Sequence, residues 1–293
     1  MMKFLKISWI SILFITCCLT AYAATQQEML KIIDLAGKQR MLTQKMSKEI
    51  LFIVNDIEPE ENKIHLYKTA ALFNMTLNGL FNGDSNLGLV EIEKPSIKRK
   101  LNKVSKLWHK FRVNVDVVLL MDEELQNQDE LLKDIAQQNL QLLEYMEDVV
   151  DWYQDESKST VQKYYEEAVT LNSAGRQRMR TQKMTKELLL MVSGINLDSR
   201  DELKKTMFDF EQTLIGLLKG NREQKLLKVN AVQNQLRMIK KQWEKYKSIL
   251  EKSIKTKRSP RNWKEVAKLN LTLLKEMDNA VQMYRRHFKG TPK

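Results

Sequence analysis

The sequence is poor in the residues that build catalytic and metal sites. It has 2 Cys and 3 His among 293 residues, and both cysteines, Cys17 and Cys18, lie near the N-terminus. From residue 24 onward the chain therefore has no thiolate nucleophile, no disulfide and no Cys-ligated metal. No histidine has a glutamate three residues before it, as a di-iron helical bundle would need. No Gly-rich phosphate loop, haem-attachment motif or nucleophile elbow is present. We expect no cofactor, no metal and no catalytic residues, and thus not an enzyme.

Helix-breaking residues are also scarce. The chain has 4 Pro and 9 Gly, while Leu, Lys, Glu, Gln and Met, all good helix formers, are abundant. Apolar residues recur every three or four positions and never alternate for long, which indicates helices rather than strands. An all-α fold follows, with helices predicted over residues 27–55, 60–82, 96–127, 131–155, 162–193, 199–219, 223–257 and 261–288.

Residues 1–23 have the features of a secretory signal peptide. Lys3 and Lys6 precede an apolar run from Ile7 to Leu19, and Ala21-Tyr22-Ala23 is a small-residue cleavage site. The run is short for a membrane span. We expect a periplasmic protein released by cleavage; the alternative is an inner-membrane protein anchored by this segment, uncleaved.

Positive charge is in excess. The formal net charge is +12, or +10 without Lys3 and Lys6, and much of it lies in residues 252–261 and 285–293. Such surfaces attract nucleic acid, anionic lipid or small anions, but nucleic acid is not an expected partner of an exported protein. We interpret both clusters as solvated positive faces.

An internal repeat is the most informative feature of the chain. The segment AGKQRMLTQKMSKEIL begins at Ala36, and AGRQRMRTQKMTKELL begins at Ala174, 138 positions later. Extended two residues toward the N-terminus, the windows are identical at 12 of 18 positions. This offset is the size of a small domain and exceeds the period of solenoid repeats.

The similarity continues beyond this motif. TLNGLFNG at Thr76 matches TLIGLLKG at Thr213, Trp108 matches Trp243, and NLQLLEYM matches NLTLLKEM near the end of each repeat. These Trp, Tyr and Leu pairs are most simply core residues. We therefore predict two tandem four-helix units, residues 24–158 and 159–293.

A helical wheel gives the first motif helix two stripes. Leu35, Leu42, Met46 and Ile53 form an ordinary core-facing stripe. The nearly opposite stripe holds Ile33, Gly37, Arg40, Gln44, Ser47 and Leu51, and its counterpart holds Gly175, Arg178, Gln182 and Thr185. A glycine costs roughly 1 kcal/mol inside a helix, so its presence favours close approach to the backbone.

The second stripe suits close contact with another helix and capture of a planar anion. A guanidinium offers paired donors in one plane, which match carboxylate or nitrate better than an ammonium does. The candidate ligand-binding residues are Gly37, Arg40, Gln44, Gly175, Arg178 and Gln182. The alternative is that both arginines are ordinary surface residues of an amphipathic helix.

The pattern A-G-[KR]-Q-R-M-x-T-Q-K-M resembles the first-helix motif of PilJ-type sensor domains, the N-terminal domains of type IV pili methyl-accepting chemotaxis transducers. It is also similar to the periplasmic nitrate/nitrite sensor domain of NarX and NarQ. The resemblance covers both repeats and is most specific over residues 36–48 and 174–186. It implies antiparallel four-helix bundles and an arginine, here Arg40 and Arg178, that binds the anion where two first helices meet.

The resemblance implies a sensor-type or binding protein that captures a nitrate- or nitrite-like anion or a signalling partner. Expected partners are that anion, a membrane-bound sensor or transducer protein, and a second copy of the chain. The chain departs from the transducers in having no second membrane span, no HAMP-type linker and no methyl-accepting coiled coil. The alternative function is a helical interaction or scaffold module, without a ligand, associated with a membrane chemosensory or pilus system.

The junction between the repeats decides whether they can share a site. Residues 154–160, QDESKST, carry no apolar side chain to bury. A reversal there would place the two motif helices side by side and bring Arg40 close to Arg178. A helix continuous through this segment would instead separate the motifs by tens of ångströms. We favour the reversal.

Overall fold

The computed structural model describes residues 26–91, 94–120, 128–159, 162–195, 198–256 and 259–289. Residues 1–23, where the export signal is predicted, lie outside the described residues. Within the described ranges, two isolated antiparallel bridges occur, Asp84 with Leu89 and Asn221 with Leu226, but no strand. In the described part of the chain, every helix is too short or too polar to span a bilayer.

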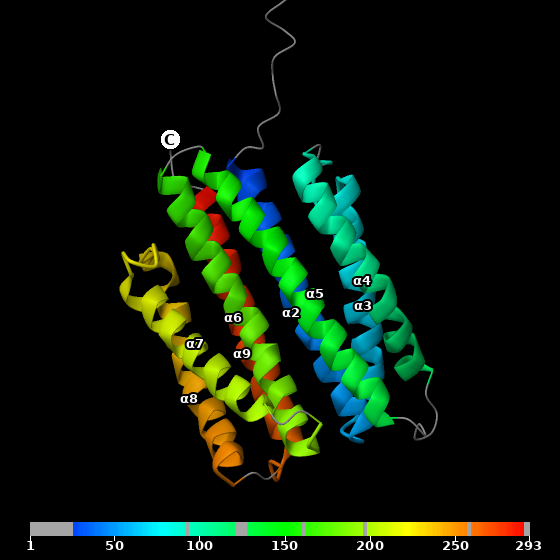
Figure 1. Ribbon diagram of the computed structural model, residues 1–293. Helices are drawn as coiled ribbons and strands as arrows, with labels where there is room; N and C mark the ends of the chain where they lie inside the picture. The colour runs from blue at the N-terminus through cyan, green and yellow to red at the C-terminus, as the bar shows by residue number, and fades with distance from the viewer. Residues whose placement is uncertain are drawn as a thin grey trace, which may run out of the picture.

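The first repeat forms an antiparallel four-helix bundle (Figure 1). Its helices are α2 (Gln26–Val54), α3 (Pro59–Asn82), α4 (Pro95–Leu119) and α5 (Gln128–Glu156). Both α3 and α4 begin with proline, whose fixed φ suits a first helical turn and whose missing N–H is not needed there.

The second repeat forms a second antiparallel bundle (Figure 1). Its helices are α6 (Gln162–Ser193), α7 (Ser199–Lys219), α8 (Gln233–Thr256) and α9 (Trp263–Lys289). The predicted fold class, all-α with two tandem four-helix bundles, is confirmed.

One predicted helix boundary is wrong. The third helix of repeat two was expected from residue 223, but α8 begins at Gln233. The intervening chain forms a turn in which Asn221 pairs with Leu226, and the Asn221 side chain accepts a hydrogen bond from the backbone N–H of Gln224. Local side-chain bonding of this kind competes with helix formation. In repeat one, α4 ends at Leu119, and residues 121–127 lie outside the description.

The two bundles have matching aromatic cores. Phe73 packs against Trp108 with ring centroids 4.5 Å apart, and Phe210 packs against Trp243 at 4.7 Å. Both tryptophans are buried. The interpretation of the repeated aromatics as core residues is confirmed at these positions.

The bundles lie side by side, and α2 packs most extensively against α6 (Figure 1). Helix α5 ends at Glu156 and is followed by a 3-10 turn, η1 (Ser157–Ser159), before α6 begins at Gln162. The chain therefore reverses at the junction, and the alternative of a continuous helix is wrong. Because α2 also packs against α3 and α5, it is buried on nearly every side, which explains why a helix with so many polar residues lies at the centre of the protein.

Candidate functional site

The two motif arginines meet across the contact between α2 and α6. A Cβ atom at Gly37 would lie 3.1 Å from Nη2 of Arg40 and 3.9 Å from Nη2 of Arg178. At Gly175 the same nitrogens would lie 3.8 and 3.5 Å away. Both guanidinium groups therefore approach the same two points. The missing side chain of Gly37 provides space for Arg40, whereas a Cβ at Gly175 would make only ordinary contacts.

Both guanidinium groups are buried. The exposed fraction is 0% for Arg40 and 1% for Arg178, so the alternative of two ordinary surface arginines is wrong. We call the region around Arg40, Arg178 and their partners the arginine layer.

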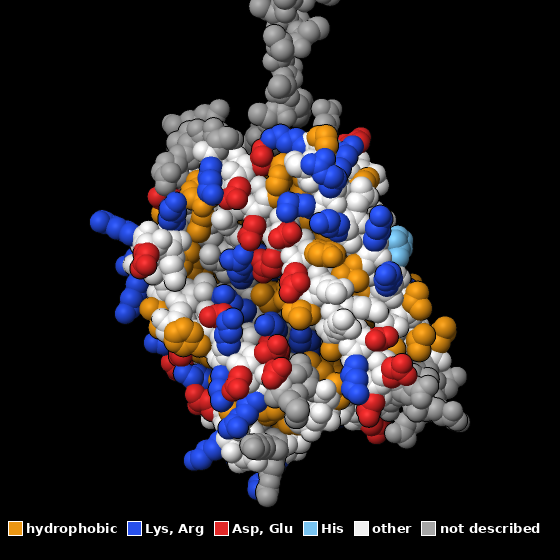
Figure 2. Space-filling view, viewed as in Figure 1, with side chains coloured by type: hydrophobic (Ala, Val, Ile, Leu, Met, Phe, Trp, Pro, Cys, Tyr) orange, Lys and Arg blue, Asp and Glu red, His pale blue; other side chains and the backbone are white. Residues whose placement is uncertain are grey.

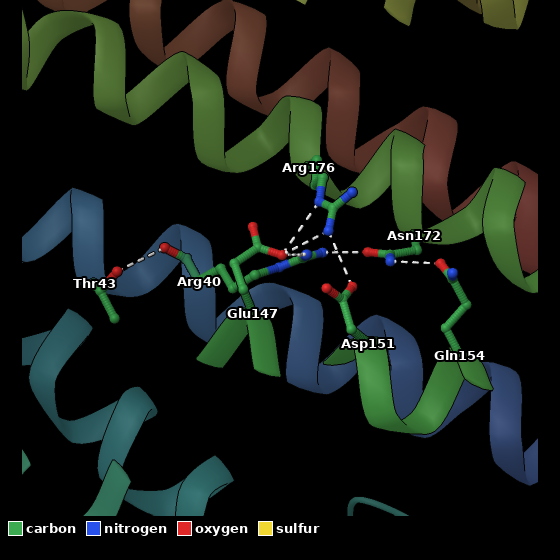
Figure 3. A network of polar contacts seen from close by, with 7 residues as sticks. All are labelled: Arg40, Thr43, Glu147, Asp151, Gln154, Asn172 and Arg176. Atoms are coloured by element: carbon green, nitrogen blue, oxygen red, sulfur yellow. Dashed lines mark hydrogen bonds and ion pairs between the residues drawn. The ribbon is translucent and has the colours of Figure 1, made fainter. Parts of the chain in front are cut away.

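Arg40 is held by residues of both bundles (Figure 3). Its Nη1 donates to Oε2 of Glu147 on α5 at 2.5 Å, and its Nη2 donates to Oδ1 of Asn172 on α6 at 2.6 Å. Arg176 on α6 also donates to Oε2 of Glu147, at 2.9 Å, and to Asp151 at 3.0 Å. Glu147 therefore bridges one arginine from each bundle.

Arg178 has the corresponding arrangement with the two bundles exchanged. Its Nη1 donates to Asp278 on α9 at 2.8 Å, and its Nη2 donates to Oδ1 of Asp34 on α2 at 2.8 Å. The second oxygen of Asp34 accepts hydrogen bonds from Arg285 at 2.9 Å and from Gln282 at 3.2 Å. Each motif arginine thus binds one residue on the other motif helix and one carboxylate on the last helix of its own bundle.

A pseudo-twofold relation links the direct partners of the two motif arginines, and one pair of these partners differs in type. The repeat alignment pairs Glu147 with Asp278, two carboxylates, but pairs Asp34 with Asn172, a carboxylate with an amide. The half around Arg178 therefore has a buried carboxylate that the half around Arg40 lacks.

The electrostatics follow from this difference. Burial lowers the pKa of Arg40, and Glu147 opposes that effect only in part. Burial also lowers the pKa of Arg178, but Asp34 and Asp278 together raise it above its ordinary value. Burial would raise the pKa of Glu147, yet Arg40 and Arg176 lower it to about 2. Arg40 therefore pairs with an ionised carboxylate at neutral pH.

The arginine layer has as many carboxylates as arginines, and some of these carboxylates are partly exposed to water. The cations are Arg40, Arg176, Arg178 and Arg285, and the carboxylates are Asp34, Glu147, Asp151 and Asp278. The side chains of Glu147 and Asp278 are 24% and 42% exposed, whereas Asp34 is 4% exposed. Figure 2 shows acidic side chains, with basic ones beside them, gathered on the surface over α5 and α6.

One donor on each motif arginine has no partner. The Nε atoms of Arg40 and Arg178 are buried and make no hydrogen bond within the described part of the chain. Buried donors are satisfied in the great majority of protein structures, so an unpartnered pair at equivalent positions is unusual.

The predicted site residues Gln44 and Gln182 lie one turn further along, in a second polar layer. The amide nitrogen of Gln44 donates to Oδ1 of Asn139 at 3.0 Å, and that of Gln182 donates to Oδ1 of Asn270 at 3.0 Å. Their amide donors are therefore occupied. The structure brings Gly37, Arg40, Gly175 and Arg178 together but leaves the two glutamines with other partners.

Two buried lysines join the bundles in this second layer, which we call the lysine layer. Lys48 on α2 donates to Asn270 of the second bundle at 3.1 Å, and Lys186 on α6 donates to Asn139 of the first bundle at 3.2 Å. Burial lowers the pKa of Lys48 to about 7 and that of Lys186 to about 8.

The sequence-based site included Gln44 and Gln182 but omitted the partners of the arginines and the lysines and asparagines of the lysine layer. The repeat carried part of the signal, since Lys48 matches Lys186 and Asn139 matches Asn270. Asp34 differs between the repeats, so similarity could not have found it. Within the described residues, no group of three His, Cys, Asp or Glu side chains could hold a metal ion.

Comparisons with known proteins identify a family and a similar solved structure. A family model described as "Type IV pili methyl-accepting chemotaxis transducer N-term" (PilJ) matches residues 22–133 and again residues 160–269. A solved structure, described as the ligand-binding domain of the P. aeruginosa nitrate receptor McpN, is 25% identical, with a TM-score of 0.36. The match covers 42% of this chain and 92% of that one. No match was found among curated proteins.

Proposed function

Because this chain belongs to the PilJ family of type IV pili methyl-accepting chemotaxis transducer N-terminal domains, in two tandem copies, we propose that it is a sensor-type protein that binds a small planar anion in the arginine layer. The anion would lie between α2 and α6, with Arg40 and Arg178 as its main donors. Nitrate and nitrite are the first ligands to test, since the guanidinium fork matches planar oxyanions.

The observation that carries this proposal is the pair of unpartnered donors. Two buried guanidinium groups from different bundles converge beside Gly37 and Gly175, and each retains a free Nε–H. Two like charges placed so close together repel each other, and an anion between them would replace the repulsion with attraction.

A ligand would also have to compete with internal carboxylates. Glu147 and Asp278 reach the layer from its partly exposed side, so each side chain can turn into water and leave its arginine to an anion. Asp34 is buried between the bundles and would stay in place. Ligand binding would then loosen α5 and α9 from the central helix pair, and this differential contact between two states is what a sensor requires.

The second candidate is a helical interaction or scaffold module without a ligand. The charge balance of the arginine layer favours it, because every guanidinium already pairs with a carboxylate. In that case the layer serves only to hold two bundles in one orientation. No catalytic role is proposed for either candidate.

Thermal melting with a panel of sodium salts tests the first proposal. An anion at 100 times its dissociation constant should stabilise the protein by about 2.7 kcal/mol. Substitution Glu147→Gln should raise anion affinity, because it removes the charge that competes for Arg40. Glu144→Gln is the matched control: Glu144 is an exposed residue one turn earlier on the same helix.

The substitutions Arg40→Lys and Arg178→Lys should each weaken binding, since an ammonium cannot reproduce the paired geometry. If no planar anion shifts the melting curve of the wild type or of Glu147→Gln, the scaffold function is the correct one.

We propose further that the protein works in the periplasm after export directed by residues 1–23. The basic start, the apolar run and the Ala21-Tyr22-Ala23 site support this. N-terminal sequencing of the protein recovered from a periplasmic extract should begin at Ala24. An intact N-terminus in the membrane fraction would instead indicate an anchor.

A further inference from the structure

A cavity of about 350 Å³ lies between the bundles at the end where α2 begins and α9 ends. Gln27 and Lys31 line it from α2, Arg286 and Lys289 line it from the last turns of α9, and Gly88 closes one side from the turn after α3. Neither motif arginine lines the cavity, but Arg285, which pairs with Asp34 at the edge of the arginine layer, does. Its volume is at the lower end of the range for small-molecule sites.

The cavity is strongly basic, and most of its cations lack an acidic partner. Lys31, Arg286 and Lys289 make no ion pair with any residue that the structure describes. Arg285, which also lines the cavity, shares Oδ2 of Asp34. Glu28 is the single acidic residue among the lining residues. The lining therefore carries an excess of three positive charges.

The equivalent place in the other half of the molecule is filled rather than open. The repeat alignment pairs Gln27 with Tyr165 and Gly88 with Lys225. There, Lys158 and Lys225 lie over the Tyr165 ring, at 5.0 and 4.7 Å from its centroid. Tyr165 is buried, with 9% of its surface exposed. A cation over an aromatic face is a favourable contact that needs no anion.

The two places share a backbone conformation, so the difference lies in the side chains. Gly88 has φ 57° and Lys225 has φ 55°, and both lie in the turn closed by the isolated bridge after the second helix of their bundle. The pairing also matches Lys289 with Lys158 and Arg286 with Asp155. Asp155 forms an ion pair with Lys158 at 2.6 Å. In one half, Asp155 pairs with Lys158 and the Tyr165 ring lies beneath both lysines. In the other half, Arg286 and Gln27 take these two positions and a cavity lies beside them.

We propose that this basic cavity is a second anion site, which binds a phosphate-bearing group carrying at least two negative charges. Three unpaired cations converge on a space larger than a nitrate ion needs, and a single negative charge would leave most of them uncompensated. Lysine ammonium and arginine guanidinium groups are the usual protein donors to phosphate oxygens. The phosphate group can belong to a free small molecule or to a lipid headgroup, since the chemistry at the cavity is the same. The site does not depend on anion binding in the arginine layer.

Isothermal titration of the purified protein with sodium pyrophosphate tests the proposal. The wild type should bind one equivalent, with weaker binding at higher salt. Lys31→Ala and Lys289→Ala should each weaken binding about five- to tenfold, because each removes one charge-assisted contact. Gln27→Tyr should abolish binding, because it places in the cavity the ring that fills the equivalent position.

The molecule contains its own control. Lys158 occupies the position equivalent to Lys289, and Lys158→Ala should change pyrophosphate affinity by less than twofold. All of these positions except Lys31 are exposed, so the substitutions leave the cores untouched. Absence of pyrophosphate binding by the wild type, or equal effects of Lys289→Ala and Lys158→Ala, would overturn the proposal.

A vesicle experiment separates the two sources of phosphate. Co-sedimentation compares phosphatidylcholine vesicles with and without phosphatidylglycerol. Binding to the anionic vesicles that Lys289→Ala and Gln27→Tyr reduce assigns the site to a lipid headgroup. Pyrophosphate binding without vesicle binding assigns it to a soluble ligand.

Discussion

Replacing Asp34 with asparagine should destabilise the protein considerably, although the two side chains have nearly the same size and shape. Asp34 is 4% exposed, and its two oxygens accept charge-assisted hydrogen bonds from Arg178 at 2.8 Å and Arg285 at 2.9 Å. An asparagine can accept from one guanidinium but turns an N–H₂ group toward the other. Arg178 would then be buried with Asp278 as its one remaining carboxylate.

The magnitude follows from the burial of the pair. Breaking a buried ion pair by removing one partner costs about 3–5 kcal/mol, and the retained amide should recover part of this. We expect the free energy of unfolding at pH 7 to fall by about 3 kcal/mol, the lower end of that range. Urea unfolding followed by circular dichroism in the far ultraviolet measures it.

Asn172→Asp is the matched substitution, because Asn172 occupies the equivalent position beside Arg40. It adds a carboxylate next to a guanidinium whose pKa burial lowers. The new carboxylate stabilises Arg40, but the substitution also removes the hydrogen bond that the Asn172 amide donates to Gln154. Because these two effects oppose each other, the free energy of unfolding should change by no more than about 1 kcal/mol.

The pH dependence gives an independent check. Burial alone would raise the pKa of Asp34, but Arg178 and Arg285 hold it below the ordinary value of 3.8. A carboxyl group with a lowered folded-state pKa adds stability above its unfolded-state pKa and loses it as the pH falls through the folded-state value. The difference between wild type and Asp34→Asn should therefore shrink below about pH 4. A loss at pH 7 no larger than that of an ordinary surface substitution, about 0.5 kcal/mol, or a difference that persists unchanged at pH 3, would refute the reasoning.

Two further predictions concern the interface between the bundles. Burial lowers the pKa of Lys48 to about 7, below the ordinary 10.5, so the buried charge destabilises the folded state below pH 7 and this cost disappears as the pH rises from 7 to 10.5. Urea unfolding should therefore show a free energy of unfolding that rises from pH 7 to 10. The rise should be smaller in Lys48→Met and unchanged in Lys110→Met, which alters an exposed site. Gly175→Ala should raise the melting temperature, because a methyl group there meets Arg178 at an ordinary 3.5 Å and alanine favours helix over glycine by about 1 kcal/mol. Gly37→Ala should raise the melting temperature less, or lower it, because its methyl group lies 3.1 Å from Arg40. Equal shifts in melting temperature for the two variants would contradict this.

Helix content and the repeat could be read from the chain because both rest on local patterns. Apolar spacing, scarce Gly and Pro, and prolines at the starts of α3 and α4 act over a few residues. The late start of α8 was missed because a turn that begins at Asn221 and closes at Leu226 competes with a helix over the same residues. The presence of helix-forming residues alone does not show which of the two forms.

The residues of the arginine layer were identified only in part, for a similar reason. The motif identified Gly37, Arg40, Gly175 and Arg178, because a glycine and an arginine kept at the same spacing in two copies indicate a shared constraint. It also suggested Gln44 and Gln182, whose donors are occupied by Asn139 and Asn270. Helical spacing places a residue on a face but does not say which neighbour that face meets.

By itself, the sequence determined an all-helical chain built twice, the family to which it belongs, and the arginines that distinguish its central helices. Only the tertiary structure decided that these arginines are buried together and already paired with carboxylates. The partners Asp34, Glu147 and Asp278 are far in sequence from the arginines they bind. Glu147 and Asp278 meet their arginines through the packing of each bundle, and Asp34 meets Arg178 only because the chain reverses at η1 and brings α2 against α6. The same packing leaves a basic cavity beside Gln27 and places the Tyr165 ring at the equivalent position in the other half. This difference appears only once α2, α9 and the turn after α3 lie against one another. Such pairings depend on contacts between distant segments, and no local pattern specifies them.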